Sequence, residues 1–336
     1  MDALPDWLTP LPDAEAMRAV DRWAIEEQGV PGIELMERAG AGVARTVERL
    51  APDGPVTVLC GKGNNGGDGL VVARLLRDAG RSVSVLCTSS PQEFAGDAAA
   101  NLARLPGAPP VGLDGAPWDG SQATGSEDPL AAGLLVDALL GTGSSGEPRG
   151  AIAAAIAAIA RREAATVVSV DLPSGVDASD GTVGGVAVSA TCTVTFHAAK
   201  PGLWIRPGKA HAGSIEVIDI GVPRGAPMAA SIGLLDAAVT ALIPRRTATA
   251  SKFDSGHVVV AGGSIGLGGA PAMAARASMR AGAGYVTACV PASLQPILAG
   301  AGTPEMMTRA LPEEDGGPAA SAVEEVLAAA ARGDRG

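Results

Sequence analysis

The spacing of hydrophobic residues along the chain predicts where its strands and helices lie. Runs of consecutive apolar residues predict buried strands, and apolar residues that recur every three or four positions predict helices. We interpret as strands the residues 56–60, 82–87, 134–140, 166–170, 191–197 and 214–220. The predicted helices run from Asp13 to Gly29, from Pro31 onward, and over residues 70–79, 92–104 and 151–162. Strands that alternate with helices indicate a parallel sheet covered on both faces, so the predicted fold class is α/β with a doubly wound sheet.

A second and shorter pattern begins after residue 230. It contains two clear strands, 257–261 and 285–290, with a helix between them that reaches Gly282, and an Ala/Glu-rich helix in the last 26 residues. Two strands are few for a layered domain. We therefore predict a first domain over residues 1–225 and an incomplete second α/β domain over residues 231–336. Residues 105–129, rich in Gly, Pro and Asp, are predicted to be irregular.

Composition and charge exclude several classes of protein. The 25 Lys and Arg residues against 36 Asp and Glu residues give a net charge of −11, and aromatic residues make up 2%. Nucleic-acid surfaces need basic stripes and stacking rings, and peripheral membrane proteins need a basic patch. An acidic chain with few aromatic residues is therefore not expected to bind nucleic acid or a membrane surface. The first ten residues show no secretory signal, and the apolar stretch 151–160 is too short to span a bilayer. Four widely separated cysteines are typical of a reducing compartment, so we predict a cytoplasmic protein.

The most informative segment is the glycine-rich sequence GKGNNGGDG at residues 61–69. It follows a predicted strand and precedes a predicted helix, and Gly61, Gly63 and Gly66 have the spacing of a dinucleotide-binding loop. A dinucleotide fold of the dehydrogenase type also places a carboxylate at the end of its second strand. That strand ends in Cys-Thr-Ser-Ser at residues 87–90, which disfavours a standard nicotinamide dehydrogenase.

The polar residues in this loop predict a binding site. Asn64, Asn65 and Asp68 could each cap a helix, but a cap needs one such residue and not three. Two further loops, VDALLGTG at 136–143 and VDLPSGVD at 170–177, leave predicted strands in the same direction.

Parallel strands bring these three loops to one edge of the sheet, where ligands bind. We therefore expect Asn65, Asp137, Asp171 and Ser174 to converge. Two carboxylates, a carboxamide and a hydroxyl form an oxygen-rich site, which is typical of a hard cation.

These loops, with TFHAAKPGL at 195–203 and SIEVIDIGVP at 214–223, resemble the NAD(P)H-hydrate epimerase domain over roughly residues 14–223. The resemblance implies a Rossmann-like, three-layer αβα fold. It also implies interconversion of the R and S epimers of hydrated NADH and NADPH, in which C6 of the nicotinamide ring carries a hydroxyl group. Inversion at that carbon calls for a proton-transfer group.

The resemblance assigns roles to residues of this sequence. It implies a potassium ion held by Asn65, Asp137 and Ser174. Our candidate for proton transfer is Asp171, with Lys200 as the alternative, although a solvated surface lysine is an equally good interpretation of Lys200. The implied substrate contacts are Asn64, Asn65, Gly66, Gly67, Asp68, Gly141, Thr142, Gly143, Ser144, Ser145, Gly146, Glu147 and Asp171.

Residues 251–311 resemble the start of the ADP-dependent NAD(P)H-hydrate dehydratase domain, which has a ribokinase-like fold. In that family Ala270 would contact the hydrated nucleotide, and ADP and magnesium serve the complete domain. The family's downstream glycine-rich segment ending in Gly-Asp has no counterpart before Gly336. We therefore expect this truncated half to lack dehydration, so that the chain epimerises the hydrated cofactor without dehydrating it.

Two other motifs are rejected. Residues 262–266 match the GxSxG elbow of serine hydrolases, but the histidines at 197, 211 and 257 all precede the serine, against the order of that triad. The glycines of 202–209 are spaced one residue too far apart for a phosphate loop, and Ala210 stands where Ser or Thr should be.

The remaining alternatives are an NAD-dependent oxidoreductase and a non-catalytic Rossmann-like binding module. The expected partner is a small-molecule substrate, with no nucleic acid and no membrane, and we expect a homo-oligomer.

Overall fold

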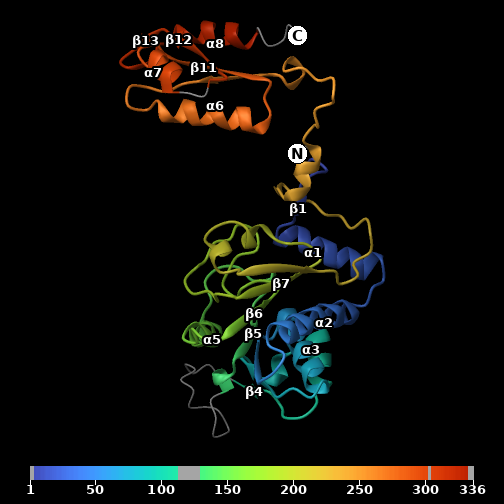
Figure 1. The fold of residues 1–336 in the computed structure, drawn as a ribbon. Coiled ribbons are helices and arrows are strands. Elements are labelled where there is room, and N and C mark those ends of the chain that lie inside the picture. Colours follow the sequence, from blue (N-terminus) through green and yellow to red (C-terminus); the bar gives the residue numbers. More distant parts are fainter. Residues whose placement is uncertain (1–3, 113–128, 302–303, 332–336) are drawn as a thin grey trace. The chain divides into compact units, whose positions relative to one another are not determined.

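The computed structural model describes residues 4–112, 129–301 and 304–331 (Figure 1). The chain divides into two compact units, Met1–Val239 and Thr240–Gly336, and each is described by itself. Residues 231–239, which we assigned to the second domain, cluster with the first unit. The reason is that β9 (Ile232–Leu234) pairs antiparallel with β1 (Thr9–Leu11).

The first unit is built on a seven-stranded parallel sheet with the order β4-β3-β2-β5-β6-β7-β8. The order reverses between β2 and β5, which is the doubly wound topology, so the predicted fold class is confirmed. The strands are β2 (Val56–Cys60), β3 (Val83–Cys87), β4 (Val111–Gly112), β5 (Leu134–Ala138), β6 (Thr166–Val170), β7 (Cys192–Phe196) and β8 (Ser214–Ile218). β4 lies within the segment predicted to be irregular, where that prediction was wrong; residues 113–128 lie outside the described part of the chain.

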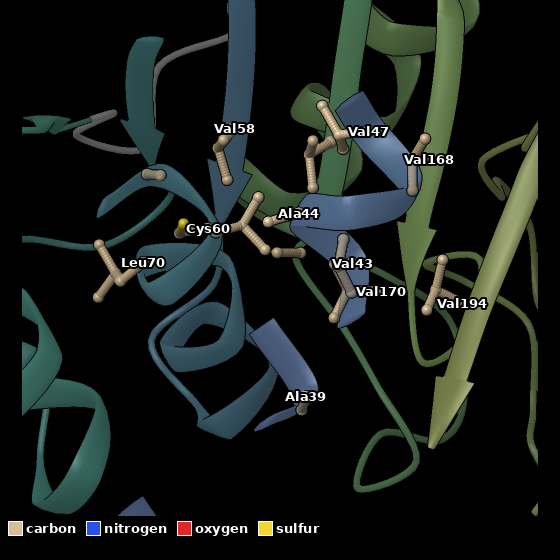
Figure 2. Close-up of a cluster of buried hydrophobic side chains, with 14 of the residues drawn as sticks. Ala39, Val43, Ala44, Val47, Val58, Cys60, Leu70, Val168, Val170 and Val194 are labelled. Carbon is tan, nitrogen blue, oxygen red and sulfur yellow. The ribbon is translucent and has the colours of Figure 1, made fainter. Parts of the chain in front are cut away.

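Helices cover both faces of this sheet (Figure 1). Successive side chains of a strand point to opposite faces, so Val58 and Cys60 of β2 pack against α2 and α3, and Leu59 packs with the α5 side. Figure 2 shows the first of these clusters, in which α2 supplies small side chains such as Ala44 and Val47. The helices are α1 (Ala14–Arg22), a π-helical turn (Trp23–Glu27), α2 (Gly32–Leu50), α3 (Asn64–Asp78), α4 (Gly96–Ala103) and α5 (Gly150–Ala160).

The glycine-rich segment is the start of a helix and not a separate loop. We predicted a helix from about Leu70, whereas α3 begins at Asn64. A Cβ at Gly66 would lie 1.7 Å from the carbonyl oxygen of Gly61, and one at Gly69 would lie 2.6 Å from the side chain of Ala138. These glycines therefore let the helix begin directly against β2 and β5.

The second unit has a three-stranded parallel sheet with the order β10-β11-β12. The expectation of two clear strands missed β12, whose polar Thr308 and Arg309 interrupt the apolar run. The elements are β10 (His257–Ala261), α6 (Gly269–Ala281), β11 (Tyr285–Pro291), α7 (Gln295–Ala301), β12 (Met306–Leu311), β13 (Glu313–Glu314), β14 (Gly317–Pro318) and α8 (Ala322–Ala330). Short 3-10 turns span Pro91–Glu93, Pro129–Ala131, Pro201–Leu203, Gly208–Ala210, Ala237–Leu242 and Phe253–Ser255.

Candidate functional site

Asp137, near the end of β5, is fully buried and accepts four hydrogen bonds. The hydroxyl of Ser169 donates to Oδ2 over 2.8 Å, and the backbone N–H of Leu139 donates to Oδ1 over 3.3 Å. Ser174 donates twice, through its hydroxyl over 2.5 Å and its backbone N–H over 2.9 Å. Burial raises the pKa of Asp137, and the bonds from Ser174 counteract part of that rise. The loops after β5 and β6 therefore meet, as predicted.

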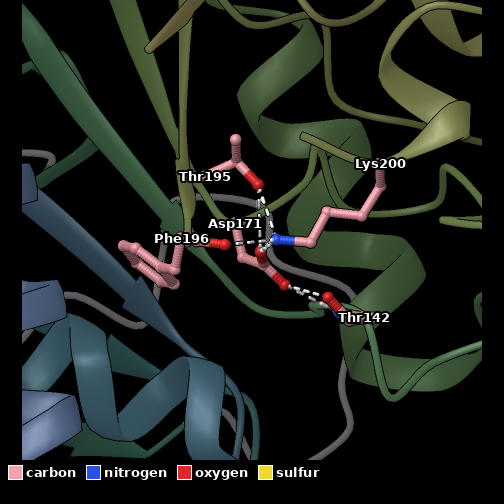
Figure 3. Close-up of polar contacts among 5 residues, drawn as sticks. All are labelled: Thr142, Asp171, Thr195, Phe196 and Lys200. Carbon is pink, nitrogen blue, oxygen red and sulfur yellow. Dashed lines mark hydrogen bonds and ion pairs between the residues drawn. The ribbon is translucent and has the colours of Figure 1, made fainter. Parts of the chain in front are cut away.

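Asp171, the first residue after β6, forms a buried ion pair with Lys200 (Figure 3). The ammonium group of Lys200 donates to Asp171 Oδ1 and to the hydroxyl of Thr195, each over 2.7 Å, and to the carbonyl oxygen of Phe196 over 3.1 Å. Lys200 is 1% exposed, so its interpretation as a solvated surface lysine was wrong. All three of its N–H donors are used inside the protein.

The carboxylate of Asp171 is saturated with hydrogen bonds. Oδ1 accepts from Lys200 and from the hydroxyl of Thr195, and Oδ2 accepts from both the backbone N–H and the hydroxyl of Thr142. Burial acts to raise the pKa of Asp171, but the charge and hydrogen bond of Lys200 and the two bonds from Thr142 outweigh it, so the pKa lies below its usual value. This group is an ionised carboxylate without a free lone pair.

Asn65, in the first turn of α3, has a side-chain amide without partners. Its nitrogen and oxygen are both buried, and neither forms a hydrogen bond within the described residues. A Cβ at Gly141 would lie 3.0 Å from Asn65 Oδ1 and 3.2 Å from Asp171 Oδ2, so both side chains border Gly141. The preceding residue, Leu140, donates its N–H to the hydroxyl of Ser174 over 2.9 Å. The loop after β5 thus links the residues that we expected to converge.

The donor set fits a monovalent cation. It contains one carboxylate, on Asp137, whose two oxygens here each accept two hydrogen bonds, and neutral oxygens on Ser174 and Asn65. Of these three residues, Asn65 is the one whose side-chain oxygen accepts no hydrogen bond within the described residues. Across the described residues, no group of three or more His, Cys, Asp and Glu side chains could hold a metal ion. Calcium and magnesium favour several carboxylates or phosphates. The buried amide oxygen of Asn65, which has no donor here, is the observation that most favours an ion at this place.

Asp68, in the second turn of α3, is buried at 9% exposure. Its carboxyl group accepts no hydrogen bond within the described segments. Burial, followed by the charges of Asp171 and Asp21, raises the pKa of Asp68 well above its usual value, and Lys200 lowers it only in part. Asp68 therefore lies close to the Asp171–Lys200 pair.

The remaining predicted contacts fall into separate groups. A Cβ at Gly67 would lie 2.7 Å from Met36, so Gly67, like Gly66, faces the interior and leaves only its backbone for a ligand. Asn64 is exposed. Ala270 is exposed near the start of α6, in the second unit.

A cavity of about 580 Å³ lies beside the loop after β5. Its lining includes Gly143, Ser144, Ser145, Gly146 and Glu147 from the predicted contacts. It is also lined by residues 175–177 and 182–184, which the sequence analysis did not select. Thr142, which bonds to Asp171, lies in the chain between two residues of this lining, Leu140 and Gly143.

Sequence reasoning also missed polar residues beside the buried carboxyl groups. Ser169 of β6 bonds to Asp137, Thr195 of β7 bonds to Asp171 and Lys200, and Asp21 of α1 contributes a charge that acts on Asp68. Lys200 was selected only as an alternative. Thr195 could have been found as a polar residue in an apolar strand, close to the edge of the sheet where the site lies. Nothing in the sequence distinguishes Asp21 from other charged residues on helix surfaces.

Comparisons with known proteins agree with this architecture. Residues 32–202 match the family described as YjeF-related protein N-terminus. The chain is 42% identical, over 96% of its length, to a bifunctional NAD(P)H-hydrate repair enzyme Nnr of Salinibacter ruber, and covers 62% of that protein. It is 44% identical, over 63% of its length, to an NAD(P)H-hydrate epimerase of Pirellula staleyi, and covers 92% of it.

A solved structure shows the same fold. The crystal structure of yeast ynu0, YNL200c, superposes with a TM-score of 0.53 at 24% identity, covering 68% of this chain and 97% of that one. The chain spans about 60% of the length of the bifunctional relatives that it matches. Within the described residues, no helix is both long enough and apolar enough to cross a membrane.

Proposed function

This chain belongs to the YjeF-related protein N-terminus family, and from that premise we propose that its first unit interconverts the R and S epimers of hydrated NADH and NADPH. The similarity to a protein named NAD(P)H-hydrate epimerase, of which the chain covers 92%, supports this activity. The observation that carries the proposal is the meeting of Asn65, Asp171 and Ser174 around one loop at the carboxyl edge of the sheet. A doubly wound sheet binds its ligands there.

We propose that the positive charge of the reaction develops beside the negative Asp171. When the C6 hydroxyl group leaves, the nitrogen beside C6 shares its lone pair, and the ring becomes a cation. An ionised carboxylate fixed in a buried site stabilises such a cation without reorganising. Lys200 and Thr142 hold Asp171 in that state. We first expected Asp171 to transfer the proton. Because each of its two oxygens already accepts two hydrogen bonds, we propose instead that Asp171 acts through its charge.

We propose that Asn65, Asp137 and Ser174 hold a potassium ion. Such an ion would supply a fixed positive charge that organises the loops after β2, β5 and β6. Residues 141–147 would contact the rest of the substrate along the cavity beside them.

For the second unit we keep the expectations drawn from its motifs. We propose that it binds ADP and magnesium, as the resemblance of residues 251–311 implies. The relatives that span it are named bifunctional NAD(P)H-hydrate repair enzymes. ADP-dependent formation of NADH from the S epimer is the assay for this second activity. We also propose a cytoplasmic homo-oligomer.

The epimerase proposal is tested by following R-enriched NADH hydrate by chromatography with the full chain and without protein. We expect the chain to accelerate equilibration of the epimers well beyond the spontaneous rate. Asp171→Asn should reduce the enzyme-dependent rate by about 100-fold or more, since it removes the charge but keeps the shape. Asp180→Asn makes the same change at an exposed residue of the segment between β6 and β7, to which Asp171 also belongs, and should behave like the parent. A parent chain no faster than the spontaneous reaction would refute the proposal.

A further inference from the structure

Among the described residues of the first unit three aspartates are buried, and they differ in their hydrogen bonds. Asp137 and Asp171 each accept four. Asp68 is as buried as Asp171, yet its carboxyl group accepts none within the described parts of the chain. A buried carboxylate without hydrogen bonds is costly, whereas a protonated carboxyl group is neutral and can be buried at much lower cost.

We infer that Asp68 is the residue that donates the proton in the epimerisation, to the C6 hydroxyl group as it leaves. The inference rests on the proposed function and deepens it, because it assigns proton donation to Asp68 and stabilisation of the ring cation to Asp171. Asp171 is ionised and saturated, and Lys200 has no N–H left to donate. Asp68 is the buried acid at this edge that remains available.

The groups around Asp68 favour its neutral form. The negative charges of Asp171, after β6, and of Asp21, on α1, both raise the pKa of Asp68, and burial raises the pKa of Asp21 itself. Lys200 is the nearby cation, but its three donors point at Asp171, Thr195 and Phe196. On α2, which packs on α3, Glu37 is paired with Arg74 over 2.5 Å. The thiol of Cys60, on β2, adds no charge, because its hydrogen bond with Cys87 and its burial raise its pKa.

Burial and the two negative charges raise the pKa of Asp68, while the pKa of Asp171 is lowered. Two carboxyl groups whose pKa values are moved apart in this way can divide acid and charge-stabilising roles between them.

The step balances with this assignment. Asp68 donates its proton to the C6 hydroxyl group, the C6–O bond breaks, and its electron pair leaves with the water that forms. The lone pair of the ring nitrogen N1 becomes the second bond between N1 and C6, and the cation lies beside ionised Asp171. A water molecule adds to the opposite face of C6 and returns the pair to N1. It releases its surplus proton to solvent, and Asp68 recovers a proton from solvent.

The test compares Asp68→Asn with Asp78→Asn in the full chain. Asp78 is exposed at the end of the same helix, so its variant is the matched control. We expect Asp68→Asn to lose about 100-fold or more of the enzyme-dependent rate, the usual contribution of a positioned acid. The parent should lose activity as the pH rises through the raised pKa of Asp68, with the spontaneous rate subtracted at every pH.

Folding is checked with the same proteins. Because the folded pKa of Asp68 lies above its unfolded value, ionising this group costs stability as the pH rises. Asp68→Asn removes that cost, so at about pH 8 it should unfold at a higher urea concentration than the parent. A loss of activity in a more stable protein cannot come from unfolding.

A second readout does not depend on activity. The infrared difference spectrum of parent minus Asp68→Asn should contain the C=O stretch of a protonated carboxyl group at neutral pH. Absence of that band overturns the inference and leaves the proposed function standing. An Asp68→Asn variant that keeps its rate within about threefold of the parent has the same consequence. A parent chain without epimerase activity overturns the proposed function and this inference together.

Discussion

Replacing Lys200 with methionine removes the cation from the buried ion pair with Asp171 and keeps an apolar side chain of similar length. The change deletes three hydrogen bonds, to Asp171, Thr195 and the carbonyl oxygen of Phe196. It leaves an uncompensated carboxylate in the interior. Removing one partner of a buried ion pair costs about 3–5 kcal/mol, a large share of the roughly 5–15 kcal/mol that stabilises a domain.

Tryptophan fluorescence in urea measures this cost for the first unit, because all four tryptophans, at positions 7, 23, 118 and 204, lie before residue 240. With an m value of about 2 kcal/mol per molar urea, a loss of about 4 kcal/mol lowers the unfolding midpoint by about 2 M. The matched control is Lys62→Met, which breaks the exposed ion pair with Glu93. Exposed pairs contribute at most about 1 kcal/mol.

Two further observations make the reasoning refutable. The double variant Lys200→Met with Asp171→Asn removes both charges and should recover most of the lost stability. The pKa of Asp171 is lowered in the fold, so the stability that Lys200 provides is present above the usual carboxyl pKa and is lost as the pH falls through the folded value. A cost of Lys200→Met below about 1 kcal/mol, or costs that simply add in the double variant, would show that the pair is not the buried network described.

The other predictions concern two glycines and their controls. Gly141→Ala should reduce epimerisation by about 10- to 100-fold with little loss of stability, because its Cβ displaces both Asn65 and Asp171. Gly133→Ala, at the other end of β5, has no atom within 4 Å of its Cβ and should keep the parent rate; equal rates for the two variants would contradict the geometry. Gly66→Ala should destabilise the first unit by at least about 3 kcal/mol in urea unfolding, because the Cβ would overlap a backbone carbonyl. Gly63→Ala meets nothing and should cost no more than about 1 kcal/mol; similar costs at both positions would show that α3 does not start against β2.

The sequence was sufficient for the parallel sheet and for the edge where the site lies. Strands such as 56–60 and 166–170 are continuous apolar runs between helices, and a parallel sheet sends the loops after them to the same edge. That reasoning placed Asp137 and Ser174 together, and they form hydrogen bonds.

The finer features depend on packing that a sequence pattern does not contain. The start of α3 was predicted too late, because glycines are usually read as loop residues and here they allow close contact with β2. Lys200 could not be told from a surface lysine, because its burial depends on Asp171 lying 29 residues away in the chain. The short strand β4 and the strand β12 lack a clear apolar run.

The most direct test of the account is the rate at which the chain equilibrates R-enriched NADH hydrate in potassium buffer and in potassium-free buffer, for the parent and for Asn65→Ala. The amide of Asn65 has no hydrogen bond to lose within the described residues, so this variant removes a proposed ion ligand with little effect on folding. We predict that potassium accelerates the parent and that Asn65→Ala is slow and insensitive to the ion. A parent whose rate is the same in both buffers, or a variant that responds to potassium as the parent does, would contradict it.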